Sequence, residues 1–450
     1  MKNIDRRTFM QMLGISSSLA LFSRPFASTT KIQPKSSRKI DISQFDKVLL
    51  PREHGQLTSM VKPLTRRYPS REHCMQMAAF FNEKKGVLVI ANDPEGGTAD
   101  WHIQPNRTLT INFYETDPDV LVIDIEPTIE AAAKVYKEWA VKQYWIQGRK
   151  RAAPKLNFVS VASSSSIAVE KKHLNQVLNT VDGTIGVWLT QWRSNPFDRK
   201  YPDYTPKEPA ELAKFFSYIA ANGGLAFPYL NGLLWDRELK SFQSRGERIA
   251  VRTVRQKTIA YNRKLDFLNY ACPYTPEWQD KIVNARNSLK GIDGQLTGGV
   301  YLDMLAAVSP MACWSTDHGH EPGDYGAWRR GVRELLKKID GLIMIEGCAE
   351  IYMDLFDYPL MHQYTDRVDT VNLWNLVYGD YVQALGWRLP KGVEHLQFEK
   401  TLRQSRAAGL NSYASPWMVS EPESALFKRQ LINYSVKSNT KTSVDTRAKK

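Results

Sequence analysis

The strongest constraint on the fold is an alternation of strand-like and helix-like segments that begins near residue 156. Short β-rich runs such as GTIGVWLTQW, LAFPYLNG, LDFLNYACP, GGVYLDM and LIMIEG alternate with amphipathic stretches such as PAELAKFFSYIAANGG and YGAWRRGVRELLKKIDG. Parallel strands need crossover helices, so this order predicts an α/β fold. The segment is long enough for a (β/α)8 TIM barrel, which typically takes about 250 residues. No glycine-rich phosphate loop follows any of these strands, which disfavours a doubly wound nucleotide-binding sheet.

The barrel is expected to follow a smaller β-rich domain. The runs KKGVLVIAND, NRTLTINFYE and DVLVIDIE are bounded by turn residues and predict a small antiparallel β-sandwich. TIEAAAKVYKEWAVKQYW then has helical periodicity, and its Tyr136, Trp139 and Trp145 are expected to pack between the two domains. The expected organisation is a signal peptide (1–27), a polar linker (28–44), the β-rich domain (45–127), a linking helix and linker (128–155), the barrel (156–432) and a polar tail (433–450).

The N-terminal segment has the layout of a twin-arginine export signal. Arg6 and Arg7 precede Phe9, an apolar run extends from about Met10 to Phe22, and a small-residue cleavage position follows at Ala27. The apolar run is shorter than the roughly 18 residues of a membrane-spanning helix. The sequence therefore predicts a periplasmic or secreted protein, exported by the twin-arginine machinery and without a stable membrane anchor.

The net charge limits the classes of partner. The chain has 61 Lys and Arg against 47 Asp and Glu, which gives +14. A basic balance favours acidic partners, and an anionic polysaccharide would fit. The basic residues are scattered, and no arginine-rich arm, zinc finger or helix-turn-helix pattern occurs, so nucleic acid is not expected as a partner.

Polar and aromatic residues follow the ends of the predicted strands, where barrel enzymes carry their active sites. Asp303 ends GGVYLDM and Glu346 ends LIMIEG, and neighbouring strand ends lie about 5 Å apart. That spacing suits a retaining glycosidase, in which one carboxylate attacks and the other donates a proton. We expect Asp303 to be the nucleophile and Glu346 the acid/base. Sugar contacts are expected from Trp192, Asp198, Asp203, Tyr229, Asn231, Asp236, Trp314, His318, His320, Glu350 and Asp380.

The histidines and cysteines allow a second interpretation. His318 and His320 would point the same way in an extended chain, so they could bind a metal together with Asp317 or Asp324. Hydrogen bonding to substrate is the preferred role, and no metal or other cofactor is expected. The four cysteines are widely spaced and form no CxxC pair, which argues against a structural zinc site. Three of them are predicted to be buried thiols near strand ends, and the role of Cys74 is left open.

Several blocks resemble an uncharacterised bacterial family of glycoside-hydrolase-like barrels that carry a domain of unknown function. The blocks are FDRKYPDYTP, FPYLNGLLWD, CPYTPEWQ, GVYLDMLAAVSPMACWSTDHGHEPG followed by Trp328, and IEGCAEIYM, and the resemblance extends from about Thr128 to about Trp387. The family is distantly similar to endo-α-N-acetylgalactosaminidases and to α-amylase and α-galactosidase barrels. The resemblance implies a strand-four Asp as nucleophile and a strand-five Glu as acid/base, which match Asp303 and Glu346. The α-galactosidase type would instead place the acid one strand later, at Asp380 in LVYGDY.

Three functions remain open from the sequence. The first is an exported glycoside hydrolase that acts on an α-linked sugar. The second is a carbohydrate-binding barrel that keeps the aromatic residues but lacks a close carboxyl pair. The third is a metal-dependent hydrolase or lyase centred on His318 and His320.

Overall fold

The computed structural model describes residues 32–60, 62–149, 153–161, 171, 174–175, 177–179, 181–361 and 369–386. The predicted export signal, the polar tail and the last part of the predicted barrel lie outside these residues. Within the described part of the chain, helices are too short or too polar to cross a lipid bilayer.

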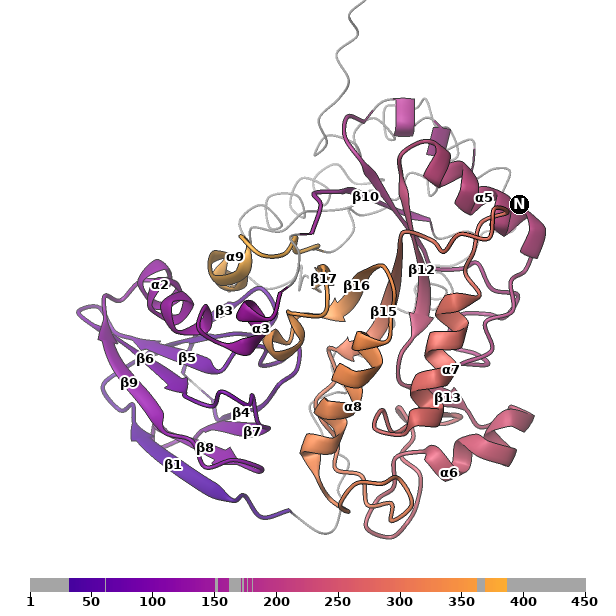
Figure 1. Ribbon diagram of the computed structural model, residues 1–450. Helices are drawn as coiled ribbons and strands as arrows, with labels where there is room; N and C mark the ends of the chain where they lie inside the picture. Colours follow the sequence, from indigo (N-terminus) through magenta and orange to yellow (C-terminus); the bar gives the residue numbers. More distant parts are fainter. Residues whose placement is uncertain are drawn as a thin grey trace, which may run out of the picture.

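Two antiparallel sheets form the N-terminal domain (Figure 1). The first has the order β1 (Ser36–Asp41), β8 (Thr108–Phe113), β7 (Ala99–Ile103), β4 (Leu64–Tyr68). The second has the order β3 (Gln56–Ser59), β2 (Lys47–Leu50), β5 (Met77–Phe81), β6 (Gly86–Ala91), β9 (Val120–Ile125). The domain is larger than predicted, because β1 lies in the expected linker and completes the edge beside β8 through pairs from Ser36–Phe113 to Asp41–Thr108.

The second domain is built on a six-stranded sheet in which every neighbouring pair is parallel. Its order is β10 (Asn157–Val161), β11 (Ile185–Leu189), β12 (Leu225–Asn231), β15 (Gly299–Ala306), β16 (Leu342–Gly347), β17 (Tyr358–Leu360). The predicted α/β class with a preceding antiparallel domain is confirmed. The described residues form a parallel half-barrel, and a complete (β/α)8 barrel is not confirmed.

Helices lie in the predicted places, the first at the link between the two domains and the other three main ones between strands of the parallel sheet. The main ones are α2 (Ile129–Ala140), α5 (Pro209–Ala221), α7 (Pro276–Asn287) and α8 (Tyr325–Lys337). Proline at the first position starts α5 and α7, where its fixed φ suits the helix and its missing N–H costs nothing. The Thr128 and Asp324 side chains cap α2 and α8 by accepting the backbone N–H groups of Ala131 and Gly326. The shorter helices are α3 (Tyr144–Gln147), η2 (Phe242–Gly246), α6 (Glu247–Ile249), η3 (Glu350–Tyr352) and α9 (Leu373–Tyr378).

One predicted barrel strand belongs to a different sheet. LDFLNYACP forms β14 (Leu268–Tyr270), which pairs antiparallel with β13 (Leu234–Asp236) in a separate two-stranded sheet. β12 pairs directly with β15. A single short apolar run does not reveal its partner, because antiparallel and parallel strands of this length have the same side-chain period. β10 is the first strand of the parallel sheet. β15 is therefore still its fourth strand and β16 its fifth, although β14 does not belong to this sheet.

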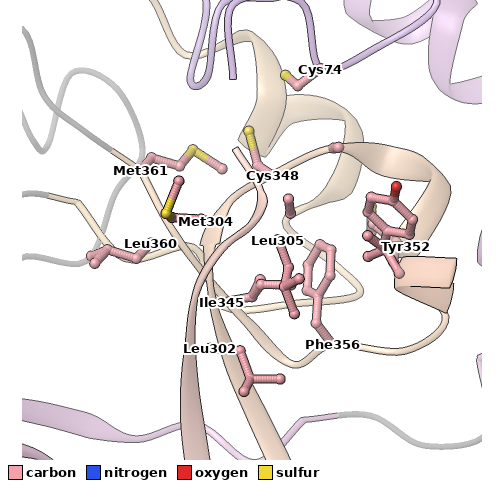
Figure 2. Packing of buried hydrophobic residues seen from close by; sticks show 14 of the residues in the cluster. Cys74, Leu302, Met304, Leu305, Ile345, Cys348, Tyr352, Phe356, Leu360 and Met361 are labelled. Atoms are coloured by element: carbon pink, nitrogen blue, oxygen red, sulfur yellow. The ribbon is translucent and has the colours of Figure 1, made fainter. Parts of the chain in front are cut away.

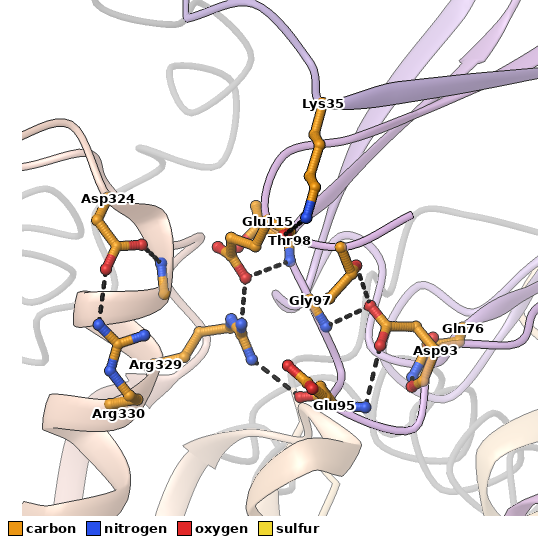
Figure 3. Close-up of polar contacts among 12 residues, drawn as sticks. Lys35, Gln76, Asp93, Glu95, Gly97, Thr98, Glu115, Asp324, Arg329 and Arg330 are labelled. Atoms are coloured by element: carbon orange, nitrogen blue, oxygen red, sulfur yellow. Dashed lines mark hydrogen bonds and ion pairs between the residues drawn. The ribbon is translucent and has the colours of Figure 1, made fainter. Parts of the chain in front are cut away.

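The two domains are joined by buried charge pairs and by continuous apolar packing. Arg329 of α8 donates to the Glu95 carbonyl oxygen at 3.1 Å and pairs with Glu115, whose carboxylate also accepts the Thr98 backbone N–H (Figure 3). Apolar packing also crosses the boundary, because Cys74 of the N-terminal domain neighbours Cys348, which follows β16, in the same buried cluster as Leu305 and Ile345 (Figure 2). These contacts fix the N-terminal domain against the C-terminal half of the parallel sheet.

Candidate active site

Asp303 and Glu346 occupy the expected neighbouring strand ends. The register pairs Leu302 of β15 with Ile345 of β16, which places Asp303 beside Glu346. Within β15 every residue except Asp303 is buried, and in β16 only Leu342 and Glu346 are partly exposed. Two partly exposed carboxyl groups in otherwise buried strands are accessible from solvent, which makes them candidates for contact with a substrate.

The Asp303 carboxylate accepts three hydrogen bonds from the parallel sheet. Tyr229 Oη donates to Oδ2 at 2.7 Å, Tyr301 Oη donates to Oδ1 at 3.0 Å, and Asn231 Nδ2 donates to Oδ2 at 3.2 Å. Donors on both oxygens stabilise the ionised form and fix the plane of the carboxylate. This arrangement suits a carboxylate that attacks along a defined direction.

The Glu346 carboxylate is held by a β-bulge and by the N-terminal domain. The pairing of β15 with β16 shifts between Leu302 and Ala306, and Met304 adopts a left-handed φ of 74°. A bulge re-aims local backbone groups, and here the Met304 N–H donates to Glu346 Oε2 at 3.0 Å. Arg71, from the loop between β4 and β5, donates to Oε1 at 2.7 Å. One oxygen of the Glu346 carboxyl group therefore accepts from backbone in a strained conformation, and the other forms an ion pair with the N-terminal domain.

The two carboxyl groups interact directly, and each affects the ionisation of the other. Burial, followed by the negative charge of Glu346, raises the pKa of Asp303 well above its usual range, against the effect of the tyrosine donors. Two carboxyl groups in contact cannot both be ionised without a large electrostatic cost. The raised pKa of Asp303 and the Arg71 contact of Glu346 favour Asp303 as the proton carrier in the free protein, whereas attack by Asp303 requires the proton to lie on Glu346.

Asp198 is a third acidic group near this pair. It follows β11 and has a left-handed φ of 58°. The Tyr201 hydroxyl group donates to its Oδ1 at 3.4 Å. Burial raises its pKa to about 6, Arg193 opposes that change, and the charge of Glu346 adds to it. The pKa of Tyr261 is raised by burial, by Tyr270 and by the three carboxylates. The structure thus brings Asp198 to the predicted site.

Six predicted sugar contacts instead support the site or its loops, and two of them, Tyr229 and Asn231, are buried and donate to Asp303. Trp192 is buried and donates its indole N–H to the Tyr229 carbonyl oxygen at 3.1 Å. Asp203 holds a local turn by accepting from the Thr205 hydroxyl group at 2.6 Å. Asp236 is fully buried and accepts the backbone N–H groups of Lys200 and Glu238. Trp314 is partly buried and packs over Gly323.

Glu350 and Asp380 lie in settings that do not suit direct contact with substrate. Glu350 is fully buried between the domains and accepts hydrogen bonds from Tyr136, Tyr378 and the Gln76 backbone N–H. Asp380 has a side chain that is 76 % exposed and pairs with Lys137 of α2 at 2.6 Å. Since Glu346 contacts Asp303, the strand-five residue fits the acid position better than Asp380.

The two histidines turn towards cysteines. Cys272, Cys313, His318 and His320 form a cluster whose ligand atoms all lie within 4.8 Å of one another, which suits a metal ion. Asp317 and Asp324, considered as ligands from the sequence, are not in this cluster, and Asp324 caps α8. All four cysteines are buried free thiols, which confirms the expected burial of three of them. Cys74, whose role was left open, is also buried. The widely spaced cysteines thus come together with histidines despite the lack of a CxxC motif.

Sequence reasoning missed several residues of the site. Tyr301 could have been found, because it precedes Asp303 by two positions and so shares its face of the strand. Tyr261 lies in an irregular segment after α6, and no sequence pattern points to it. Arg71 comes from a different domain, and its contact with Glu346 depends on domain packing that no local pattern reveals.

Comparisons relate this chain to a protein family, to relatives by sequence and to solved structures. The family described as "Domain of unknown function (DUF6259)" matches residues 120–389. A Bacteroides thetaiotaomicron protein described as "Putative glycoside hydrolase" is 28% identical over 426 residues, which cover 84% of this chain and 60% of that protein. A Monosiga brevicollis protein with a similar description is 26% identical over 189 residues, which cover 36% of this chain and 16% of that protein. The chain thus spans less than two thirds of either relative.

Two solved structures share the fold at low identity. The ligand-free α-N-acetylgalactosaminidase NagBb from Bifidobacterium bifidum has a TM-score of 0.66 at 14% identity, covering 88% of this chain and 74% of that chain. The α-galactosidase TtGalA from Thermus thermophilus has a TM-score of 0.63 at 11% identity, covering 88% of this chain and 87% of that chain. The family match spans more than half of the chain, and this protein therefore belongs to the family defined by the domain of unknown function DUF6259.

Proposed function

We propose that the protein is a glycoside hydrolase that cleaves an α-linked sugar in an oligosaccharide or polysaccharide with retention of configuration. The observation that carries the proposal is the contact between two partly exposed carboxyl groups on the fourth and fifth strands of the parallel sheet. The names of the relatives and of the structural neighbours point to the same reaction class and to an α-linkage.

In the proposed mechanism Asp303 attacks the anomeric carbon while Glu346 protonates the departing glycosidic oxygen. The bond from sugar to leaving group breaks, and a covalent ester between the sugar and Asp303 forms. Glu346, now ionised, then removes a proton from water, and the resulting oxygen attacks the anomeric carbon and releases Asp303. A retaining pair works at about 5–5.5 Å separation, so we propose that the entering sugar parts the two carboxyl groups and that the proton of the pair moves from Asp303 to Glu346 as they separate.

The metal-dependent alternative fits the structure less well. A catalytic metal needs an open coordination position, whereas the cluster around His318 supplies four protein ligands. The carbohydrate-binding alternative remains a distinct outcome of the experiments, because it requires binding without turnover.

The direct test is a screen of the purified protein against aryl α- and β-glycosides and a panel of neutral and anionic polysaccharides. We expect turnover of an α-glycoside, with the α-anomer of the free sugar as the first product by proton NMR. An inverted first product would refute retention, and binding without turnover would favour the carbohydrate-binding alternative. Salt-sensitive activity on anionic polymers alone would support a role for the +14 charge in substrate capture.

We also propose export through the twin-arginine pathway, on the basis of Arg6, Arg7 and the apolar run after them. Replacing both arginines by lysine preserves the charge but removes the paired guanidinium groups. We expect the protein to move from the periplasmic or secreted fraction to the cytoplasmic fraction on cell fractionation. Unchanged export of the double variant would contradict this pathway.

Arg71→Gln is expected to alter the pH dependence of turnover. Loss of the Arg71 charge removes a cation that favours an ionised carboxyl group in the Asp303–Glu346 pair. The acidic limb of the kcat/KM profile should therefore move to higher pH, with a lower maximum. The charge-matched control is Arg38→Gln, whose partner Asp117 lies on the surface of the N-terminal domain. An unshifted profile in Arg71→Gln would show that the ion pair serves only domain packing.

A further inference from the structure

We propose that Cys272, Cys313, His318 and His320 bind one zinc ion in a closed, structural site. The site would fasten the long connection between β15 and α8, which follows Asp303, to the chain that leaves the β13–β14 sheet. This function is separate from sugar cleavage and stands on its own geometry.

The distances within the cluster match the edges of a tetrahedral zinc site. Cys313 Sγ lies 3.3 Å from His318 Nδ1, and Cys272 Sγ lies 3.5 Å from His320 Nε2. Zinc bonds of about 2.3 Å to sulfur and about 2.0 Å to nitrogen place tetrahedral ligand atoms about 3.5 Å apart. The four ligand atoms all lie within 4.8 Å of one another, so a small inward movement suffices to coordinate an ion.

The second nitrogen of each imidazole is already engaged as in metal-bound histidines. His318 Nε2 lies 2.8 Å from the Arg248 carbonyl oxygen, and His320 Nδ1 lies 2.9 Å from the Glu321 carbonyl oxygen. A carbonyl oxygen accepts only, so these nitrogens carry the protons. The lone pairs of His318 Nδ1 and His320 Nε2 then face the cysteine sulfurs. Such backbone contacts fix the tautomer and orientation of ligating histidines.

The donor set selects the class of metal. Two thiolates and two imidazoles suit zinc, whereas calcium and magnesium prefer oxygen ligands. The Arg252 backbone N–H points at Cys313 Sγ at 3.4 Å, which would stabilise a thiolate. Cys272, Cys313 and His318 are at most 5 % exposed, and the partly exposed His320 occupies the fourth position, so no position is left open to water. Four protein ligands and low exposure indicate a structural ion rather than a catalytic one.

The ligands connect two segments that have little regular structure of their own. Cys272 directly follows the β13–β14 sheet, whereas the other three lie in the connection from β15 to α8. Besides the cluster, this connection is held by backbone contacts, with Trp314 N–H donating to the Arg252 carbonyl oxygen at 2.9 Å and Gly323 N–H to that of Cys313 at 2.8 Å. A zinc ion here would hold the connection in place, so that its conformation depends less on the burial of apolar side chains.

The test is metal analysis of the whole protein purified without chelators or a histidine tag. We expect about one zinc per chain, released stoichiometrically when a mercurial reagent titrates the thiols. Replacement by Co²⁺ should give the visible d–d bands and the near-ultraviolet sulfur-to-cobalt transition of a tetrahedral site with two thiolates. These measurements use the native sequence and do not depend on the folding of a variant.

Variants locate the site. Cys313→Ser and His318→Gln should each lose the zinc and the thiolate–cobalt band, and should lower the melting temperature. The matched control is Cys348→Ala, which alters another buried thiol that neighbours Cys74, and it should keep the full metal content. Absence of zinc from the native protein, a Cys272–Cys313 disulfide found by peptide mass analysis, or full zinc retention in Cys313→Ser would overturn the proposal. Zinc binding with no glycosidase activity would leave this inference standing and would refute only the proposed function.

Discussion

Asp303→Asn is expected to lower kcat/KM by more than about 10³-fold on every substrate that the native protein cleaves. The asparagine amide keeps the size of the side chain, and its oxygen can still accept from either Tyr229 or Tyr301, which donate to different oxygens of the native carboxylate. It cannot form the covalent sugar ester, so no substrate should escape the defect. Steady-state kinetics with an aryl glycoside and with a natural oligosaccharide would measure the loss.

Glu346→Gln should give a different pattern, because it removes proton donation without removing the nucleophile. On substrates with poor leaving groups we expect a loss of about 10²–10⁴-fold. Substrates with a strongly activated leaving group, such as a dinitrophenyl glycoside or a glycosyl fluoride, need little protonation and should largely retain their first step. Equal losses on both kinds of substrate would contradict the assignment of Glu346 as the acid.

The matched control for both variants is Asp203→Asn. Asp203 lies in the loop after β11 and holds a turn through Thr205, so its charge is not required by the proposed chemistry. We expect its kcat/KM to stay close to that of the native protein. Circular dichroism and melting temperature would establish that all three variants are folded. Full activity in folded Asp303→Asn would refute the proposed nucleophile.

Glu350→Gln is expected to remove a pH dependence of the free energy of unfolding. Burial raises the pKa of Glu350 to about 7, in spite of hydrogen bonds from Tyr136 and Tyr378. The folded state therefore binds a proton more tightly than the unfolded state, in which the pKa is near the model-peptide value of 4.5. Stability is lost as pH rises through this window, and the loss reaches about 3 kcal/mol once the folded group is ionised.

The measurement is urea unfolding of native protein and of Glu350→Gln near pH 5 and near pH 8. Glutamine cannot ionise, so the stability of the variant relative to native protein should rise by about 2.5 kcal/mol between these pH values. The control is Asp380→Asn, which changes an exposed carboxylate on the neighbouring α9 end and should show no such rise. A relative stability that does not change with pH would show that Glu350 ionises in the folded state as it does in the unfolded chain.

Much of the second domain could be predicted from the sequence, because its elements carry local signals. The alternation of strands and amphipathic helices, the prolines that start α5 and α7, and the Thr128 cap of α2 act within a few residues. The positions of Asp303 and Glu346 at neighbouring strand ends follow from parallel pairing of consecutive β-rich runs. The run that became β14 was misplaced, because strand pairing is a non-local choice.

The sequence by itself determined the α/β class and the two carboxylates, since both depend on local periodicity and on strand order. Only the tertiary structure decided that Arg71 reaches Glu346, that Glu350 is buried between domains, and that the histidines face cysteines rather than the carboxylates. These contacts join residues that are far apart in the chain. Their partners are selected by domain packing and loop path, which no local pattern of residues encodes.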